Sequence, residues 1–300
     1  MHDVILTNPC GRTGLLVRDS LVSHGLDVFV MEGPSARKTE AFYLRTVADV
    51  LESEGARMVI PIFFPEVLSA HRDRFPGVVI PLDSAEKIRL LDNKMSACRL
   101  AAELGIPQPE MFDPEKPECI PFPAVVRRAL GQGGDSVYFP KTEKAFTNLM
   151  RTADKDTVVT RYIEGWNVSV DALRWDGFFY AAAYRILEPK GKGVSTLRES
   201  IEAPELVGYA GKILDHVDYK GVCGMDFRID GETGRPYFLE CNPRFSGGLE
   251  SAIASGFDIP YLYYRLAAGD KVTPEEISFS PGIITGQASA AIPSPGLSCL

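Results

Sequence analysis

A change in the order of strands and helices near Phe122 constrains the fold of this chain more than any other feature. Before that point, short apolar segments predict strands at residues 4–6, 28–31, 58–60 and 78–80, and helices are predicted at 15–24 and 40–54. Strands that alternate with helices indicate βαβ units, in which the strands pair in parallel. The first part of the chain, to about residue 91, therefore predicts one α/β layer domain.

After Phe122, short strands are predicted in succession at 124–127, 136–139, 158–163, 168–173 and 178–184, with one helix near 143–151. Their tight connections favour antiparallel pairing. A helix at 205–217, strands at 221–229 and 236–241 and a helix at 259–268 follow, before a tail rich in Pro, Gly and Ser. Asp92 is expected to cap a helix with an apolar stripe of Met95, Cys98 and Ala102.

Composition excludes several classes of protein. The 300 residues carry 32 basic and 40 acidic side chains, a net charge of -8, which argues against a nucleic-acid partner. No apolar run approaches the roughly 18 residues that span a bilayer, and the first residues lack the pattern of a signal peptide. The six cysteines contain no CxxC pair, which makes a zinc site an unfavoured interpretation. We therefore expect a cytoplasmic protein without a membrane partner.

The most informative stretch is a predicted hairpin between Gly224 and Arg244, with its turn at residues 230–234. Side chains alternate between the two faces of a strand, and residues opposite each other share a face. Asp226 is then expected opposite Glu240, with Asn242 on the same face. The other face is expected to be apolar and to contain Met225, Phe227, Ile229, Tyr237, Leu239 and Cys241.

Two adjacent carboxylates repel each other unless a proton or a cation compensates their charge. Carboxylate and amide oxygens suit Mg²⁺, which also takes oxygens from substrate phosphates. A solvated acidic face is the alternative interpretation of the hairpin. Pro243 and Arg244 favour the metal site, because a guanidinium beside the acids could neutralise a transferring phosphoryl group.

Three further segments contain residues typical of phosphate binding. Arg127 and Arg128 end an apolar strand, and the glycine-rich residues 131–134 follow them. Glycines let backbone N–H groups approach a phosphate, although a flexible hairpin tip is the alternative. Lys94 adds another cation near the predicted cap at Asp92. The turn at residues 11–14 is interpreted as structural, because it lacks the full dinucleotide-binding pattern.

These segments occur in the order found in ATP-grasp enzymes, which the chain resembles over about residues 1–270. The segments are Asp92-Asn93-Lys94, residues 123–137, Tyr162-Ile163-Glu164-Gly165, and the cluster from Asp226 to Arg244. Arg127 and the ending Asn242-Pro243-Arg244 are most similar to the carbamoyl-phosphate synthase large-subunit branch. The resemblance implies a Rossmann-like, parallel-sheet pre-ATP-grasp domain at 1–92. An α+β ATP-grasp domain with antiparallel sheets would follow, as a lid subdomain at 93–160 and a large subdomain with the metal site at 161–300.

The resemblance also implies roles for individual residues. ATP and Mg²⁺ would be the cofactors, with Mn²⁺ as a permitted substitute. Lys94 and Arg127 would contact the phosphates, and the loop closing over them would include Gly133 and Gly134. The hinge strand beside adenine would contain Arg161, Tyr162 and Ile163. Mg²⁺ would be held by Asp226, Glu240 and Asn242, and Arg244 would stabilise the phosphoryl group. The implied reaction phosphorylates a small-molecule carboxylate, which an amine or ammonia then attacks; a homodimer is permitted.

Two departures from the family pattern keep other functions open. Acidic residues that usually hold the ribose are replaced by Arg161 and by Asn167 or Val168. A degenerate nucleotide-binding regulatory module without turnover is therefore the alternative, and a dinucleotide-dependent oxidoreductase is a weaker third reading. The segment 190–195, with Arg198 after it, is expected to be a solvated loop, with a lid that contacts the acceptor carboxylate as the alternative.

Overall fold

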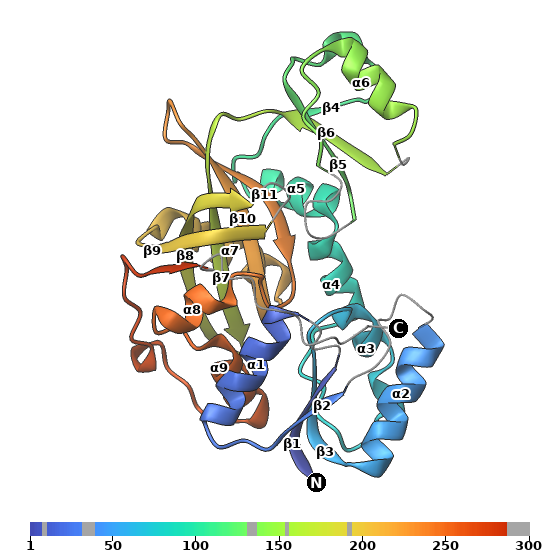
Figure 1. Ribbon diagram of the computed structural model, residues 1–300, viewed down its shortest axis with the longest axis vertical. Helices are drawn as coiled ribbons and strands as arrows, with labels where there is room; N and C mark the ends of the chain where they lie inside the picture. Colours follow the sequence, from blue (N-terminus) through green and yellow to red (C-terminus); the bar gives the residue numbers. More distant parts are fainter. Residues whose placement is uncertain (8–10, 32–39, 131–136, 154–155, 191–193, 287–300) are drawn as a thin grey trace, which may run out of the picture.

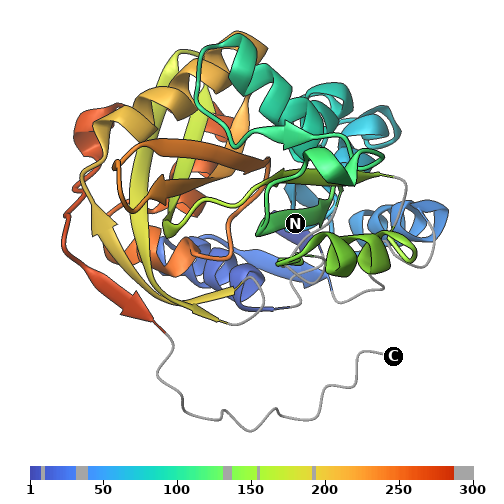
Figure 2. The same cartoon turned by 90° about the horizontal axis from the view of Figure 1, so that it is seen from above.

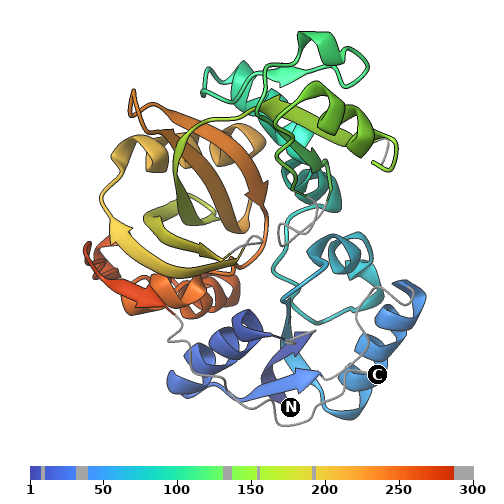
Figure 3. The same cartoon turned by 45° about the horizontal axis from the view of Figure 1, so that its top comes forward.

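Three separate β-sheets organise the protein, and the computed structural model describes them over residues 1–7, 11–31, 40–130, 137–153, 156–190 and 194–286 (Figure 1). The strand orders are β2-β1-β3, β4-β6-β5 and β11-β10-β7-β8-β9-β12. Figure 3 shows the three sheets as three lobes, with the helices α4 and α5 running between the first lobe and the other two.

The N-terminal sheet is parallel, as the alternating pattern predicts. Its strands are β1 (His2–Thr7), β2 (Val28–Met31) and β3 (Ala56–Pro61). The helices beside it are α1 (Arg12–Ser23), α2 (Glu40–Ser53) and α3 (Pro65–Ala70), with a 3₁₀ turn at Arg72–Arg74. The prediction of a strand at 78–80 is wrong, because only Val79 forms an isolated bridge, with Met58.

Two consecutive helices, α4 (Ala85–Asp92) and α5 (Lys94–Glu103), meet at Asn93. The Oδ1 atom of Asn93 accepts hydrogen bonds from the backbone N–H groups of Met95 at 3.0 Å and Ser96 at 3.1 Å. The prediction that Asp92 caps this helix is therefore wrong by one residue, since Asp92 is the last residue of α4. Of the predicted apolar stripe, only Cys98 is buried.

The second sheet is small and antiparallel, as predicted. Its strands are β4 (Met111–Phe112), β5 (Ala124–Arg128) and β6 (Thr157–Arg161), with helix α6 (Glu143–Met150) beside them and a 3₁₀ turn at Pro117–Cys119. Val126, Phe146 and Val159 form the centre of its own small core. In place of the strand predicted at 136–139, the described residues contain an isolated bridge between Tyr138 and Val126.

The third sheet is the largest and is antiparallel throughout. Its strands are β7 (Gly165–Trp175), β8 (Phe178–Lys190), β9 (Val194–Ile201), β10 (Gly221–Asp230), β11 (Pro236–Asn242) and β12 (Ile284–Gly286). The accompanying helices are α7 (Pro204–Val217), α8 (Leu249–Ala254) and α9 (Ile259–Ala268), with a 3₁₀ turn at Pro274–Glu276. Seen from above, β12 lies at the outer edge (Figure 2).

The two faces of this sheet have different neighbours. One face carries Val170, Met225 and Phe227, which pack in a core shared with residues of α5 and α7. The other face carries Leu173 and Val222, which pack with residues of α8, α9 and α1. Further along the second face, towards the start of β7 and the end of β10, polar side chains replace the apolar ones.

A β-bulge alters the expected hairpin faces. Asp226 pairs with Glu240 as predicted, but the register shifts before the next pair, which joins Phe227 to Phe238. Phe238 is fully buried, whereas Tyr237 and Leu239 are partly exposed. The expectation that Tyr237 and Leu239 share the apolar face is therefore wrong, because the extra residue of a bulge reverses the facing of the residues beyond it.

Gly165 begins β7 in a backbone conformation that other residues rarely adopt. Its φ is 150°, and a Cβ atom added there would overlap the carbonyl oxygen of Ile229. The preceding residue is held close by a hydrogen bond of 2.8 Å from the Gly231 N–H to the Glu164 carbonyl oxygen. The segment between the second and third sheets therefore packs directly on the backbone of β10.

We predict that Gly165→Ala lowers the melting temperature, because the added methyl group overlaps backbone that cannot move alone. The expected cost is about 3 kcal/mol, or roughly 6 °C for a chain of this size. Gly208→Ala in α7 is the matched control, since open space surrounds that position. Alanine there should raise the melting temperature slightly. Calorimetry that finds Gly165→Ala as stable as Gly208→Ala would contradict the packing described here.

Candidate active site

Two rows of side chains cross the second face of the large sheet. Their members are set by the pairing of β7 with β10 and of β10 with β11. The first row contains Ser169, Asp226 and Glu240, and the second contains Asp171, Gly224 and Asn242. Residues paired across antiparallel strands point to the same side. The sheet therefore brings together the three residues predicted to bind a metal.

Two cations from other parts of the chain contact Glu240. The Nζ atom of Lys94 lies 3.3 Å from Glu240 Oε2, and the Nη1 atom of Arg127 lies 4.0 Å from the same oxygen. Both cations are 7% exposed. Although burial raises the pKa of the Glu240 carboxyl, Lys94 and Arg127 outweigh that effect and lower it. The predicted phosphate-binding residues therefore converge on the predicted metal-binding ones.

Lys94 owes its position to the break between α4 and α5. Its backbone N–H donates to the carbonyl oxygen of Ala129 at 3.0 Å, which ties the start of α5 to the end of β5, where Arg127 lies. Both cations are thus held at the junction of the two antiparallel sheets. Two donors of Arg127, Nε and Nη2, are buried and have no hydrogen-bond partner among the described residues.

Asp226 lacks such direct compensation. Its pKa is raised, first by burial and then by the negative charge of Glu240, while Arg198 and Arg244 lower it. Two facing carboxylates with this electrostatic cost are the donor set that a hard divalent cation neutralises. In the part of the chain that the structure describes, no group of three or more His, Cys, Asp or Glu side chains is arranged for a metal. The observed set is two carboxylates and one amide.

Asn242 links the acids to Arg244. Its Nδ2 atom donates to Glu240 Oε1 at 3.1 Å, and its Oδ1 atom accepts from Arg244 Nη2 at 2.9 Å. The Nε atom of Arg244 is buried without a hydrogen-bond partner among the described residues. The amide oxygen that would bind a cation is therefore already used by Arg244, and a bound cation would have to compete for it. Once Arg244 releases that amide oxygen, the two carboxylates and the amide are a set of oxygen ligands that suits Mg²⁺.

Arg198 approaches the first row from β9. Its Nη1 atom donates to Ser169 Oγ at 3.0 Å. A Cβ atom at Gly248 would overlap its guanidinium, so the glycine provides the space that Arg198 occupies. The expectation of a loop at 190–195 is wrong at residues 190, 194 and 195, which belong to the strands β8 and β9. Residues 191–193 lie outside the described residues.

The residues predicted to form the hinge lie at the end of β6 and directly after it. Arg161 is exposed, Tyr162 is half-buried and Ile163 is buried. Arg228 holds this segment: its Nε donates to the Ile163 carbonyl oxygen at 3.0 Å and its Nη1 donates to Asn167 Oδ1 at 2.9 Å.

Sequence reasoning missed Arg228, although it lies two residues after Asp226, where strand alternation predicts the same face. Gly133 and Gly134, which were predicted to belong to a phosphate loop, lie outside the described residues.

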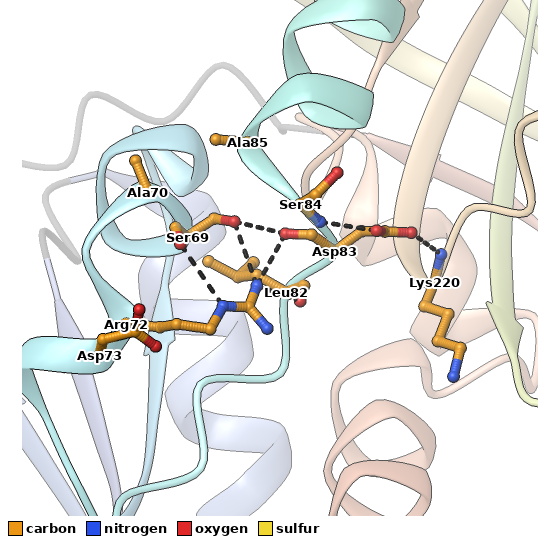
Figure 4. Close-up of a pocket in the computed structure, with 9 residues that line it drawn as sticks. All are labelled: Ser69, Ala70, Arg72, Asp73, Leu82, Asp83, Ser84, Ala85 and Lys220. Carbon is orange, nitrogen blue, oxygen red and sulfur yellow. Dashed lines mark hydrogen bonds between the residues drawn. The ribbon is translucent and has the colours of Figure 1, made fainter.

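A separate cavity of about 480 Å³ lies at the junction of the N-terminal sheet with the rest of the chain (Figure 4). The Arg72 guanidinium donates to Ser69 and to the carbonyl oxygens of Leu82 and Asp83. Asp83 in turn accepts from the backbone N–H of Lys220 at 2.7 Å. These polar groups are used in holding two parts of the chain together, so we assign the cavity a structural role.

Comparisons of the sequence with known proteins find similarity to ATP-grasp proteins. Residues 153–286 match the family model described as ATP-grasp in the biosynthetic pathway with Ter operon. The carbamoyl phosphate synthase large chain of Acidobacterium capsulatum is 25% identical over 236 residues, which are 70% of this chain and 21% of that protein. The chain thus spans about a fifth of the length of this curated relative.

Solved structures extend the similarity to nearly the whole chain. Biotin carboxylase from Campylobacter jejuni in complex with βγ-ATP has a TM-score of 0.77 at 17% identity, over 95% of this chain and 74% of that one. The L-amino acid ligase from Bacillus licheniformis has a TM-score of 0.73 at 14% identity, over 95% of this chain and 78% of that one. Among the described residues, no helix combines the length and the hydropathy that a membrane-spanning segment requires. Residues 153–286 thus match an ATP-grasp family model, and nearly the whole chain shares the fold of these two solved structures.

Proposed function

We propose that the protein is an ATP- and Mg²⁺-dependent ligase that joins a small-molecule carboxylate to an amine or ammonia. The observation that carries this proposal is the convergence of Lys94 and Arg127 on Glu240, beside Asp226. Arg127 has two buried donors without a partner among the described residues, which favours an anionic ligand, and facing carboxylates favour a divalent cation. A triphosphate with its Mg²⁺ satisfies both requirements at one place.

Lys94 and Arg127 would release Glu240 and turn to the phosphates when nucleotide binds. Asp226, Glu240 and Asn242 would then hold Mg²⁺, which supplies charge neutralisation between the phosphates. The segment from Arg161 to Ile163 would contact adenine. The hydrogen bonds from Arg228 to Ile163 and Asn167 would keep that segment in place without the usual ribose-binding acids.

The chemical step would transfer the γ-phosphoryl group to an oxygen of the carboxylate, with ADP as the leaving group. The amine would then attack the acyl carbon, lose a proton and displace inorganic phosphate. Arg244 would stabilise the charge on the phosphoryl group, and Arg198 would orient the carboxylate. Catalysis would rest on positioning and electrostatics, without a protein nucleophile.

The relatives support this class of reaction. A carbamoyl phosphate synthase matches in sequence, and an L-amino acid ligase and a biotin carboxylase share the fold. Assays of ADP release with the twenty protein amino acids as carboxylates, and hydroxylamine as the trapping nucleophile, test the proposal. ATP binding in calorimetry, with no consumption in any assay, would instead indicate a nucleotide-binding regulatory module.

We predict that Glu240→Gln lowers the rate of ADP release about 100-fold or more, because one charge of the metal-binding pair is lost. Glu232→Gln, an exposed change in the turn of the same hairpin, is the matched control and should keep the wild-type rate. Circular dichroism would confirm that both variants fold. Equal rates for the two variants would count against a metal at Glu240.

We also predict that ATP and Mg²⁺ together raise the melting temperature more than ATP alone. At a concentration 100 times the Kd the gain is about 2.7 kcal/mol, or roughly 5 °C. In Asp226→Asn, the part of the shift that requires Mg²⁺ should disappear, because one carboxylate of the pair no longer carries charge. If this variant retains the full shift with Mg²⁺, Asp226 does not hold the cation.

A further inference from the structure

Asp171 is a buried acid in the second row that the proposed reaction does not use. Its side chain is 2% exposed, and neither carboxylate oxygen accepts a hydrogen bond of normal geometry from the described residues, the nearest polar side chain being that of Ser246. Leaving a buried polar group without a hydrogen bond lowers stability, and more so when the group is charged. Such a cost in a polar row beside the candidate metal ligands indicates that the group has a partner at another stage.

The residues next to Asp171 are part of the candidate active site. Asp171 pairs with Gly224, which separates it from Asn242 in the same row. A Cβ atom at Gly224 would lie 3.5 Å from Asp171 Oδ1 and 3.1 Å from Ser246 Cβ. The absence of a side chain at Gly224 therefore leaves Asp171 next to the segment that carries Arg244 and Ser246.

The nearby cations are engaged elsewhere. Arg198 donates to Ser169, and Arg244 donates to Asn242. Burial raises the pKa of Asp171, while Arg198 and the Ser246 side chain lower it less strongly. No described side chain forms an ion pair with Asp171, so its natural partner is a cation that arrives with the substrate.

We propose that Asp171 holds a protonated amine of the substrate, an assignment that rests on the proposed ligase function. An ammonium group forms charge-assisted hydrogen bonds to both carboxylate oxygens and offsets the cost of burying the acid. Access requires the segment from Arg244 to Gly248 to shift away from Gly224. The amine is either the α-amino group of the carboxylate substrate or the nucleophile, which must first pass its extra proton to the Asp171 carboxylate so that its lone pair can attack the acyl carbon.

Asp171→Asn tests the proposal with two pairs of probes. The first pair is ammonium and hydroxylamine, since hydroxylamine is largely uncharged at neutral pH. If the bound amine is the nucleophile, the variant should lose about tenfold or more in kcat/KM with ammonium and little with hydroxylamine. The second pair is each amino acid and its des-amino carboxylate. If the bound amine is the α-amino group, the variant should lose the preference for the amino acid.

Thermal melting of the ligand-free protein gives a readout that does not depend on activity. Because burial outweighs the stabilising effects of Ser246 and Arg198 on the Asp171 carboxylate, Asp171→Asn should melt at or above the wild-type temperature. Glu202→Gln, a charge-removing change at an exposed position, serves as the control. A structural role for Asp171 would instead lower the melting temperature of the variant.

The outcomes separate this assignment from the proposed function. The role of Asp171 is overturned if the variant loses activity equally with both members of each pair, or loses no activity at all. It is also overturned if the variant melts at a lower temperature than the wild type. Each of these results leaves the ligase function intact. A wild-type protein that releases no ADP with any pair of substrates overturns the ligase itself. A selective loss within either pair supports the assignment and identifies which amine is bound.

Discussion

The repulsion between Asp226 and Glu240 is the interaction on which the rest of the candidate site depends. Backbone pairing of β10 with β11 places the two carboxylates opposite each other on one face of the sheet. Such an arrangement is stable only when the repulsion is compensated by a proton or by a positive charge. Lys94 and Arg127 supply it at 3.3 Å and 4.0 Å from Glu240. The candidate site is thus an ion-pair network in which two cationic side chains meet Glu240 beside Asp226.

This network also connects the parts of the chain. Lys94 lies at the start of α5, Arg127 lies in the small antiparallel sheet and Glu240 lies in the large one. The Arg228 hydrogen bonds to Ile163 and Asn167 form a second connection, at the segment between the two sheets. Any ligand that draws Lys94 and Arg127 away from Glu240 would change how these sheets are held together.

Much of the fold and part of the site could be predicted from local patterns. The strands of the parallel sheet, helix α9 and the pairing of Asp226 with Glu240 follow from apolar periodicity, turn residues and strand alternation. Asp92 was mistaken for the cap because an adjacent Asn93 competes for the same role, and only backbone geometry decides between them. Tyr237 and Leu239 were assigned to the wrong face because a bulge leaves no clear mark in a single sequence.

By itself, the sequence determined which residue types lie on which strands, and hence that acids, an amide and an arginine share one stretch of hairpin. Only the tertiary structure decided which cations meet those acids and which acid remains without a partner. The physical reason is distance along the chain: Lys94 and Arg127 are more than a hundred residues from Glu240, and Arg198 reaches Ser169 from another strand. Local propensities carry no information on such contacts, whereas burial and charge compensation in the folded chain establish them.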